Sequence, residues 1–121
     1  MTDADSEYRR LIDAMVEACN KGQGQIAASR VHAGVWNAHV DVHSEQQAVN
    51  DLLAALTLDQ RAVLAELLTQ QYRSGIFGAL VVLSESGTPP FDRAYEGSPF
   101  EDFIGRVDGW QWPENRKPTS S

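Results

Sequence analysis

Three histidines lie within twelve residues of this 121-residue chain, and they are its first candidates for chemistry. His32, His39 and His43 follow one another at spacings of seven and four residues, which would place them on one face of a continuous helix. Neutral imidazoles so arranged can bind zinc or another divalent metal, with a nearby carboxylate completing the ligand set. Gly34 interrupts that helix, however, and the segment has no His-Glu-x-x-His motif. Histidines that serve solubility and local packing are the competing interpretation.

No other motif predicts catalysis. Ser44 and Ser98 are explained as helix caps, and no serine stands in a Gly-x-Ser-x-Gly elbow. Gly22 and Gly24 lack the third glycine and the preceding strand of a nucleotide-binding loop. Cys19 lies on the apolar stripe of an expected helix and is interpreted as a small buried residue, with a reactive thiol as the alternative. We therefore assign no catalytic and no cofactor-binding residue.

Two adjacent carboxylates near the C-terminus are also interpreted structurally. Glu101 and Asp102 point about 100° apart on a helix, which does not suit an acid–base pair. We expect both to be solvated first-turn residues that the helix dipole favours.

Two tryptophans are candidates for binding. Trp36 and Trp112 are candidate interface residues because tryptophan is enriched at protein interfaces. For Trp112, packing onto the chain's own surface near Tyr95 or Trp36 is the preferred interpretation, and a role at an interface is the alternative. A ligand pocket lined by Trp36, Tyr72 and Trp112 is a further alternative.

Composition and charge limit the class of protein. The chain carries 17 acidic and 10 basic residues, a net charge of −7, and shows no basic face that would displace counterions from a nucleic acid. The acidic balance favours solubility or attraction to a basic partner. The single cysteine excludes an internal disulfide and favours a reducing cytoplasm. No apolar run is long enough for a membrane span, so we expect a cytoplasmic protein.

The apolar spacing predicts an all-α fold, a compact single-domain bundle of four to six helices over residues 1–113, with a polar mobile tail over 114–121. Ser74-Gly75 is expected to separate two helices, the second of which is enclosed on most sides. Within an irregular passage, Val40 and Val42 allow a short strand. The expected helices cover residues 5–20, 25–33, 44–56, 57–73, 76–85 and 98–109.

The helix near the C-terminus has both ends specified by its sequence. Ser98 can cap it and form a capping box with Glu101. Gly109 can end it in the left-handed conformation, with Trp110 folding back on Ile104. Two further capping-box pairs are Ser44 with Gln47 and Thr57 with Gln60, and the apolar face of the C-terminal helix is expected to comprise Phe100, Phe103, Ile104 and Val107.

Together, three segments give the chain a resemblance to a family of small helical bacterial proteins of unknown function. The resemblance implies a bacterial or phage source and an all-α domain, and it implies no activity. The segments are Gly34-Val35-Trp36-Asn37 leading to His43-Ser44-Glu45-Gln46, Tyr72-Arg73-Ser74-Gly75-Ile76-Phe77 through Ser84-Glu85, and Asp102-Phe103-Ile104-Gly105-Arg106 to Trp110-Gln111-Trp112-Pro113.

Two hypotheses for function follow. The first is a non-enzymatic protein–protein interaction domain, either self-associating or an acidic antidote or immunity-type partner of a basic effector, with no nucleic acid or membrane involved. The alternative is a metal-binding enzyme or sensor that uses the His32, His39 and His43 cluster and a divalent metal as its cofactor.

Overall fold

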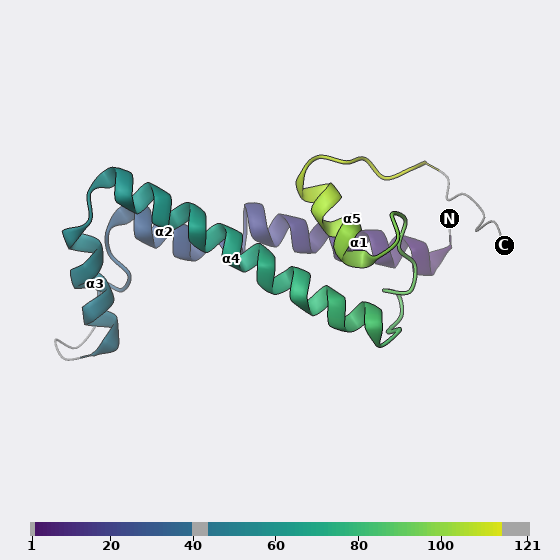
Figure 1. Cartoon of the computed structure of the whole chain (residues 1–121), viewed down its shortest axis with the longest axis horizontal. Coiled ribbons are helices and arrows are strands. Elements are labelled where there is room, and N and C mark those ends of the chain that lie inside the picture. Colours follow the sequence, from purple (N-terminus) through teal and green to yellow (C-terminus); the bar gives the residue numbers. More distant parts are fainter. Residues whose placement is uncertain (1, 40–43, 115–121) are drawn as a thin grey trace. The chain divides into compact units, whose positions relative to one another are not determined.

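The computed structural model describes residues 2–39 and 44–114, and every regular element in these ranges is helical. Five α-helices follow one another along the chain (Figure 1). The predicted all-α fold class is therefore confirmed. The helices are α1 (Asp3–Asn20), α2 (Ile26–Ala33), α3 (Glu45–Ala55), α4 (Leu58–Glu85) and α5 (Pro99–Val107), with a short 3-10 helix over Gln23–Gln25.

Several of these helices begin where capping side chains predict. The Ser44 hydroxyl accepts a hydrogen bond from the Gln47 amide at 3.2 Å. At Thr57 both bonds of a capping box form, because the Gln60 amide donates to Thr57 Oγ1 at 3.1 Å and the Thr57 amide donates to Gln60 Oε1 at 2.9 Å. Ser98 caps α5 in the same way as Ser44 caps α3. These bonds satisfy amides that have no partner within the helix.

The predicted break at Ser74-Gly75 is wrong, because α4 runs without interruption from Leu58 to Glu85 over 28 residues (Figure 1). A single glycine costs a helix only about 1 kcal/mol relative to alanine. That cost does not stop a helix whose apolar residues continue at helical spacing. The expected enclosure of the second half on most sides is also wrong, because Leu80 is the one buried residue within 76–85 and Val82 is 63% exposed.

Replacing Gly75 by alanine is expected to stabilise the chain by roughly 0.5–1 kcal/mol in urea denaturation. Gly75 lies inside α4, and a Cβ built there would meet no atom within 4 Å. The substitution therefore gains helix propensity without a steric cost. A fall in stability would indicate that Gly75 ends a helix, and it would contradict the continuous α4.

The chain forms two compact units, which we describe separately. Unit 1 comprises residues 1–17 and 74–121, and unit 2 comprises residues 18–73. The single domain over 1–113 stays a prediction.

In unit 2, α2 ends at Gly34, whose φ of 79° is the left-handed conformation that glycine adopts most easily. Asn50 of α3 holds the loop that follows. Its Oδ1 accepts the amides of Trp36 at 2.6 Å and Asn37 at 3.1 Å, and its Nδ2 donates to the Asn37 carbonyl at 2.6 Å. The buried core of this unit comprises Ala28, Val31, Leu53 and Ala65.

In unit 1, α1 carries two residues that are buried and tied to the segment before α5. The ring of Tyr8 meets that of Phe91 edge-on, with centroids 6.3 Å apart. Asp5 accepts a hydrogen bond from the Arg93 guanidinium at 3.1 Å. The largest buried apolar side chains of this unit are Tyr8, Ile12, Leu80, Phe91 and Phe103.

Within residues 2–39 and 44–114, no helix combines the length and apolar character that crossing a bilayer requires. The strand considered at Val40 and Val42 lies outside the described residues, as do residues 115–121 of the predicted tail.

Candidate functional site

The C-terminal end of α5 places Trp110 against the helix itself. The Gly109 amide donates to the Arg106 carbonyl at 3.1 Å, and the Trp110 amide donates to the Gly105 carbonyl at 2.8 Å. With a φ of 96° at Gly109, these bonds form the Schellman ending that the sequence predicted. A Cβ on Gly105 would lie 3.4 Å from Trp110 Cβ, so the tryptophan packs directly over this glycine.

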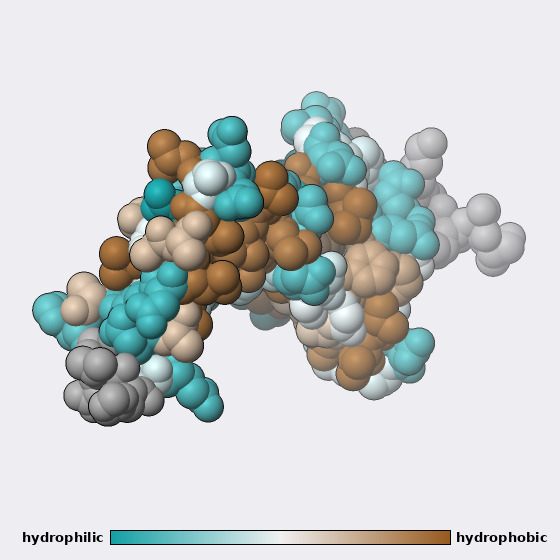
Figure 2. All heavy atoms as spheres, turned by 60° about the vertical axis from the view of Figure 1, so that its left-hand side comes forward, coloured by the Kyte–Doolittle hydropathy of each residue, from teal (hydrophilic) through white to brown (hydrophobic). Residues whose placement is uncertain are grey.

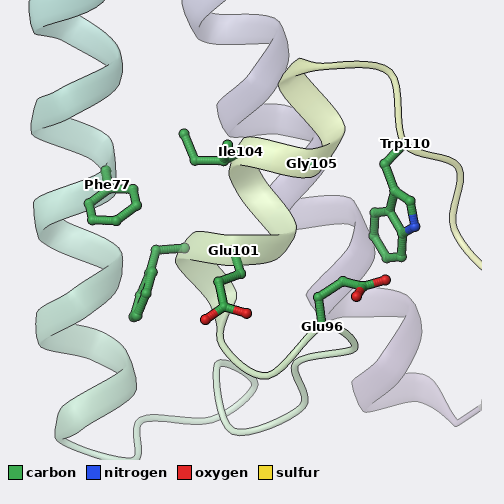
Figure 3. Close-up of a pocket in the computed structure, with 7 residues that line it drawn as sticks. Phe77, Glu96, Glu101, Ile104, Gly105 and Trp110 are labelled. Carbon is green, nitrogen blue, oxygen red and sulfur yellow. The ribbon is translucent and has the colours of Figure 1, made fainter.

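An apolar groove runs over α5 at this point, and we call it the α5 groove (Figure 3). Its volume is about 520 Å³, within the range of ligand-binding sites. Gly105 has no side chain, which allows Trp110 to pack closely against α5 and form part of the groove wall. Trp110 lies on one side of α5, while Phe77 and Ile104 lie on the other (Figure 3). The expectation that Trp110 folds back on Ile104 is therefore wrong, because the indole packs over Gly105. Phe100 packs against Phe77 with ring centroids 5.0 Å apart.

Two carboxylates, Glu96 and Glu101, are the ionisable side chains that line the α5 groove. Both residues are exposed, so their negative charges remain hydrated. Glu96 precedes α5 and Glu101 lies in its first turn, so both are near the N-terminal end of this helix (Figure 3). The α5 groove therefore combines an apolar interior with a negatively charged rim.

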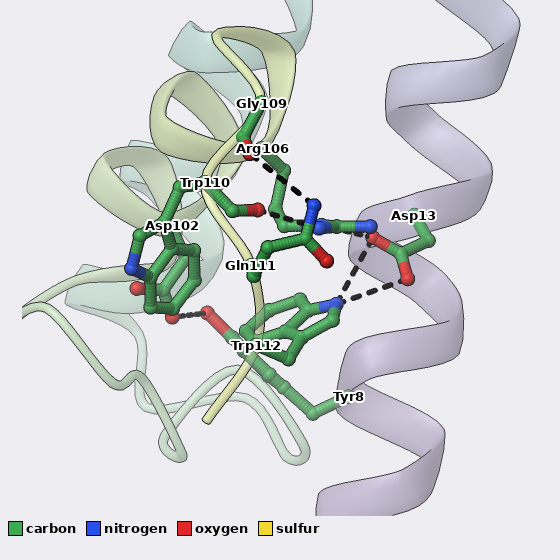
Figure 4. A network of polar contacts seen from close by, with 8 residues as sticks. All are labelled: Tyr8, Asp13, Asp102, Arg106, Gly109, Trp110, Gln111 and Trp112. Atoms are coloured by element: carbon green, nitrogen blue, oxygen red, sulfur yellow. Dashed lines mark hydrogen bonds and ion pairs between the residues drawn. The ribbon is translucent and has the colours of Figure 1, made fainter. Parts of the chain in front are cut away.

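Asp102 follows Glu101 in the first turn of α5 and is fully buried. Figure 4 shows its carboxylate next to the Tyr8 hydroxyl. Its carboxylate accepts hydrogen bonds from the Tyr8 hydroxyl at 2.5 Å and from the amides of Tyr95 and Glu96 at 2.8 Å each. The expectation that Asp102 is a solvated first-turn residue is therefore wrong. Its carboxylate instead joins α1, the segment before α5 and α5 itself. Glu101 is exposed, as expected.

A second network holds the segment after α5 against α1 (Figure 4). The Trp112 indole N–H donates to the Asp13 carboxylate at 3.0 Å, and Arg106 Nε donates to the same carboxylate at 2.7 Å. The Arg9 guanidinium lies 5.0 Å from the centre of the Tyr95 ring and 5.4 Å from that of Trp112. These contacts fix the position of the segment that carries Trp110.

The structure describes two of the three histidines of the predicted metal site. His32 lies at the end of α2 and His39 in the loop that follows, and both are exposed. His43 lies outside the described residues. Within residues 2–39 and 44–114, no three His, Cys, Asp or Glu side chains are grouped as a metal ion requires. The site formed by the three histidines stays a prediction.

The two tryptophans predicted at an interface lie in different units. Trp36 belongs to unit 2, where it packs against the core of that unit and lies beneath Arg30, whose guanidinium is 5.4 Å from its ring centre. Trp112 belongs to unit 1, where its ring packs against Tyr95 with centroids 5.1 Å apart. Both are partly buried, so their role at an interface stays a prediction. Tyr72, considered with them for a ligand pocket, belongs to unit 2.

Cys19 is fully buried in unit 2, in agreement with its interpretation as a small core residue. Burial raises the pKa of its thiol, and the positive charge of Arg73 opposes this shift to a smaller extent. The folded chain thus keeps the thiol protonated at a pH where the unfolded chain has lost the proton. The Cys19 thiol therefore lowers the free energy of unfolding as the pH rises above the ordinary pKa of a thiol.

We expect iodoacetamide to label Cys19 at least about 100-fold more slowly in the native chain than in urea at the same pH. Both burial and the raised pKa oppose formation of the reactive thiolate. Mass spectrometry of samples quenched over time measures the two rates. Equal rates would show that the thiol is accessible in the native chain and would support the alternative of a reactive cysteine.

The sequence interpretation missed the α5 groove, although one signal pointed to it. Gly105 lies within α5, in its last turn, where glycine before the end of the helix is unfavourable unless packing or function requires it. Asp102 had no comparable local signal, because its hydroxyl donor, Tyr8, is 94 residues away in the sequence.

The fold and the site together define a small all-α protein with an apolar groove bordered by carboxylates. The chain belongs to the family described as "Family of unknown function (DUF6547)", which matches residues 1–114. The resemblance to a family of unknown function is thus confirmed. No curated protein and no solved structure matches the chain.

Proposed function

We propose that this chain is a non-enzymatic interaction protein that binds a basic protein partner through the α5 groove, in the manner of an acidic antidote or immunity protein. The observation that carries this proposal is the composition of the groove. Its walls are aromatic and aliphatic, and the charges at its rim are those of Glu96 and Glu101. Aromatic anchors surrounded by charges of one sign are typical of surfaces that select a partner of the opposite charge.

The distribution of charge supports the same partner. The residues of unit 1 include twelve acidic and six basic side chains, whereas those of unit 2 include five and four. The unit that carries the α5 groove therefore carries most of the net charge of −7. A negative field around an apolar groove accelerates the approach of a basic protein and repels an acidic one.

Two other carboxylates of unit 1, those of Asp102 and Asp13, have partners within the chain. Asp102 accepts three hydrogen bonds from within the chain, and Asp13 binds both Arg106 and Trp112. These contacts hold the groove in shape before a partner arrives. A groove that is already formed reduces the entropy cost of binding.

Apolar side chains also reach the surface outside the groove, and Figure 2 shows them in brown among polar neighbours. On the first half of α4, Leu58 and Val63 are each 72% exposed and Leu67 is 48% exposed. Exposed apolar patches are typical of proteins that bind other proteins. The hollow on this part of α4 is lined by one carboxylate, that of Glu66, whereas two carboxylates line the α5 groove, so the proposal rests on the α5 groove.

Site-specific cross-linking in the native cells tests the proposal. A photoactivated benzophenone amino acid replaces Ile104 in the groove and, as the matched control, Val82, which is apolar, exposed and in the same unit but does not line the groove. We expect position 104 to capture one basic protein and position 82 to capture none. The proposal is wrong if position 104 captures nothing, or if both positions capture the same set of proteins.

A further inference from the structure

We propose that the occupant of the α5 groove is an amphipathic helix of the partner, with an apolar anchor that enters the groove and Lys or Arg residues within one turn of that anchor. This inference rests on the proposed function and adds the chemistry and the conformation of the bound segment. It is carried by the elements that line the groove, by its apolar interior and by the position of the two carboxylates.

The elements around the groove favour a helical segment. Phe77 projects from α4, while Phe100 and Ile104 project from α5, so the apolar side of the groove lies between two helices. Helix pairs of this kind accept the apolar face of a third helix, with contacts at positions i, i+3 or i+4, and i+7. A segment that binds as an added β-strand would need the free edge of a sheet, and residues 2–39 and 44–114 contain no strand to offer one.

The interior of the α5 groove suits a single large apolar side chain. Trp110 bounds it on one side and Ile104 on the other (Figure 3). Ile104 is 39% exposed, so an anchor such as leucine or phenylalanine would cover apolar surface that water now contacts. Burial of one such side chain contributes roughly 1.5–3 kcal/mol, which makes it the main source of affinity.

The carboxylates of Glu96 and Glu101 determine which positions of the bound helix should carry Lys or Arg. Glu96 and Glu101 line the groove near the N-terminal end of α5, so a cation one helical turn from the anchor can reach either of them. The face of Trp110 adds a favourable contact for a guanidinium group. An acidic helix with the same anchors would make the apolar contact but would be repelled by the carboxylates of Glu96 and Glu101. A neutral helix would make the apolar contact and gain nothing from these carboxylates.

Binding of synthetic peptides to the full chain tests the inference. The probe is an alanine-based helical peptide of about 15 residues, with leucines on one face and arginines one turn from the central leucine. Its two controls replace the arginines by glutamine or the central leucine by alanine. Calorimetry measures affinity, and NMR of the labelled chain follows the Gly105 amide and the Trp110 indole. We expect binding of the probe with shifts at these two groups, and a loss of about tenfold or more for each control.

Substitutions in the chain show which of its residues contribute to the affinity for the arginine peptide. The double substitution Glu96→Gln with Glu101→Gln is expected to weaken binding about tenfold and to reduce its dependence on salt, while leaving the helical circular dichroism unchanged. The substitution Val82→Lys is expected to leave the affinity within about twofold of the unaltered chain. Equal affinity for the arginine and glutamine peptides, or shifts away from the groove, would overturn the inference.

The two proposals fail separately. If position 104 captures a basic protein in cells but the arginine peptide binds no better than its controls, the partner uses another kind of segment and this inference is wrong. If position 104 captures nothing, the proposed function is wrong, whatever the peptides do.

Discussion

Replacing Asp102 by alanine is expected to lower the free energy of unfolding by about 3–5 kcal/mol. The carboxylate is fully buried and accepts hydrogen bonds from the Tyr8 hydroxyl and from the amides of Tyr95 and Glu96. Alanine would remove all three acceptor contacts, of which the one to the Tyr8 hydroxyl is buried and those to the amides of Tyr95 and Glu96 are partly buried. Each buried donor left unpaired costs about 1–3 kcal/mol, and bonds to a charged acceptor are at the upper end of that range.

Urea denaturation of two further variants separates the network from a general effect of charge. Asp108→Ala removes an exposed carboxylate at the C-terminal end of the same helix, where a negative charge is unfavourable, so little or no destabilisation is expected. Tyr8→Phe removes one donor and keeps the ring, and is expected to cost about 1–2 kcal/mol. If Asp102→Ala were no more destabilising than Asp108→Ala, the buried network would not hold unit 1 together.

Replacing Gly24 by alanine is the second substitution with a large expected effect, a loss of about 2–3 kcal/mol in unit 2. A Cβ at this buried position would lie 2.7 Å from Tyr72 Cδ1 and 2.9 Å from both the Ala18 carbonyl oxygen and Cys19 Cα. Two of these three contacts are with backbone atoms, which cannot move aside as the end of a flexible side chain would. The turn between α1 and α2 must therefore shift.

The matched comparison is Gly75→Ala, the same chemical change at a helical position with open space around it. The two substitutions are expected to change stability in opposite directions. Circular dichroism during urea denaturation measures both. A neutral effect of Gly24→Ala would show that the turn is looser than the structure indicates, and would contradict the close approach of Tyr72 to Gly24.

Local signals in the sequence predicted most of the helices because their ends are determined by neighbouring residues. Ser44, Thr57 with Gln60, and Gly109 each act within a few residues of their own position. The break at Ser74-Gly75 failed for the same reason: glycine weakens a helix locally, but burial of side chains along α4 is a tertiary effect that overrides this preference.

The site was less predictable, because it depends on contacts between distant segments. Helical spacing placed Phe103 and Ile104 on one apolar face, yet Phe103 is fully buried whereas Ile104 is 39% exposed beside the groove. That difference depends on where α1 and α4 pack against α5. The spacing of apolar residues within α5 carries no information about those positions. Asp102 is buried for a similar reason, since Tyr8 supplies its hydroxyl donor from α1.

The affinity of the chain for the basic protein captured at position 104 tests the central claim most directly. Both proteins would be purified, and the dissociation constant compared between the unaltered chain, Ile104→Lys and Val82→Lys. Ile104→Lys places a positive charge in the α5 groove, and we expect it to weaken binding at least about tenfold, whereas Val82→Lys adds the same charge elsewhere and should change it by less than about twofold. Equal affinities for the two variants would contradict binding through the α5 groove.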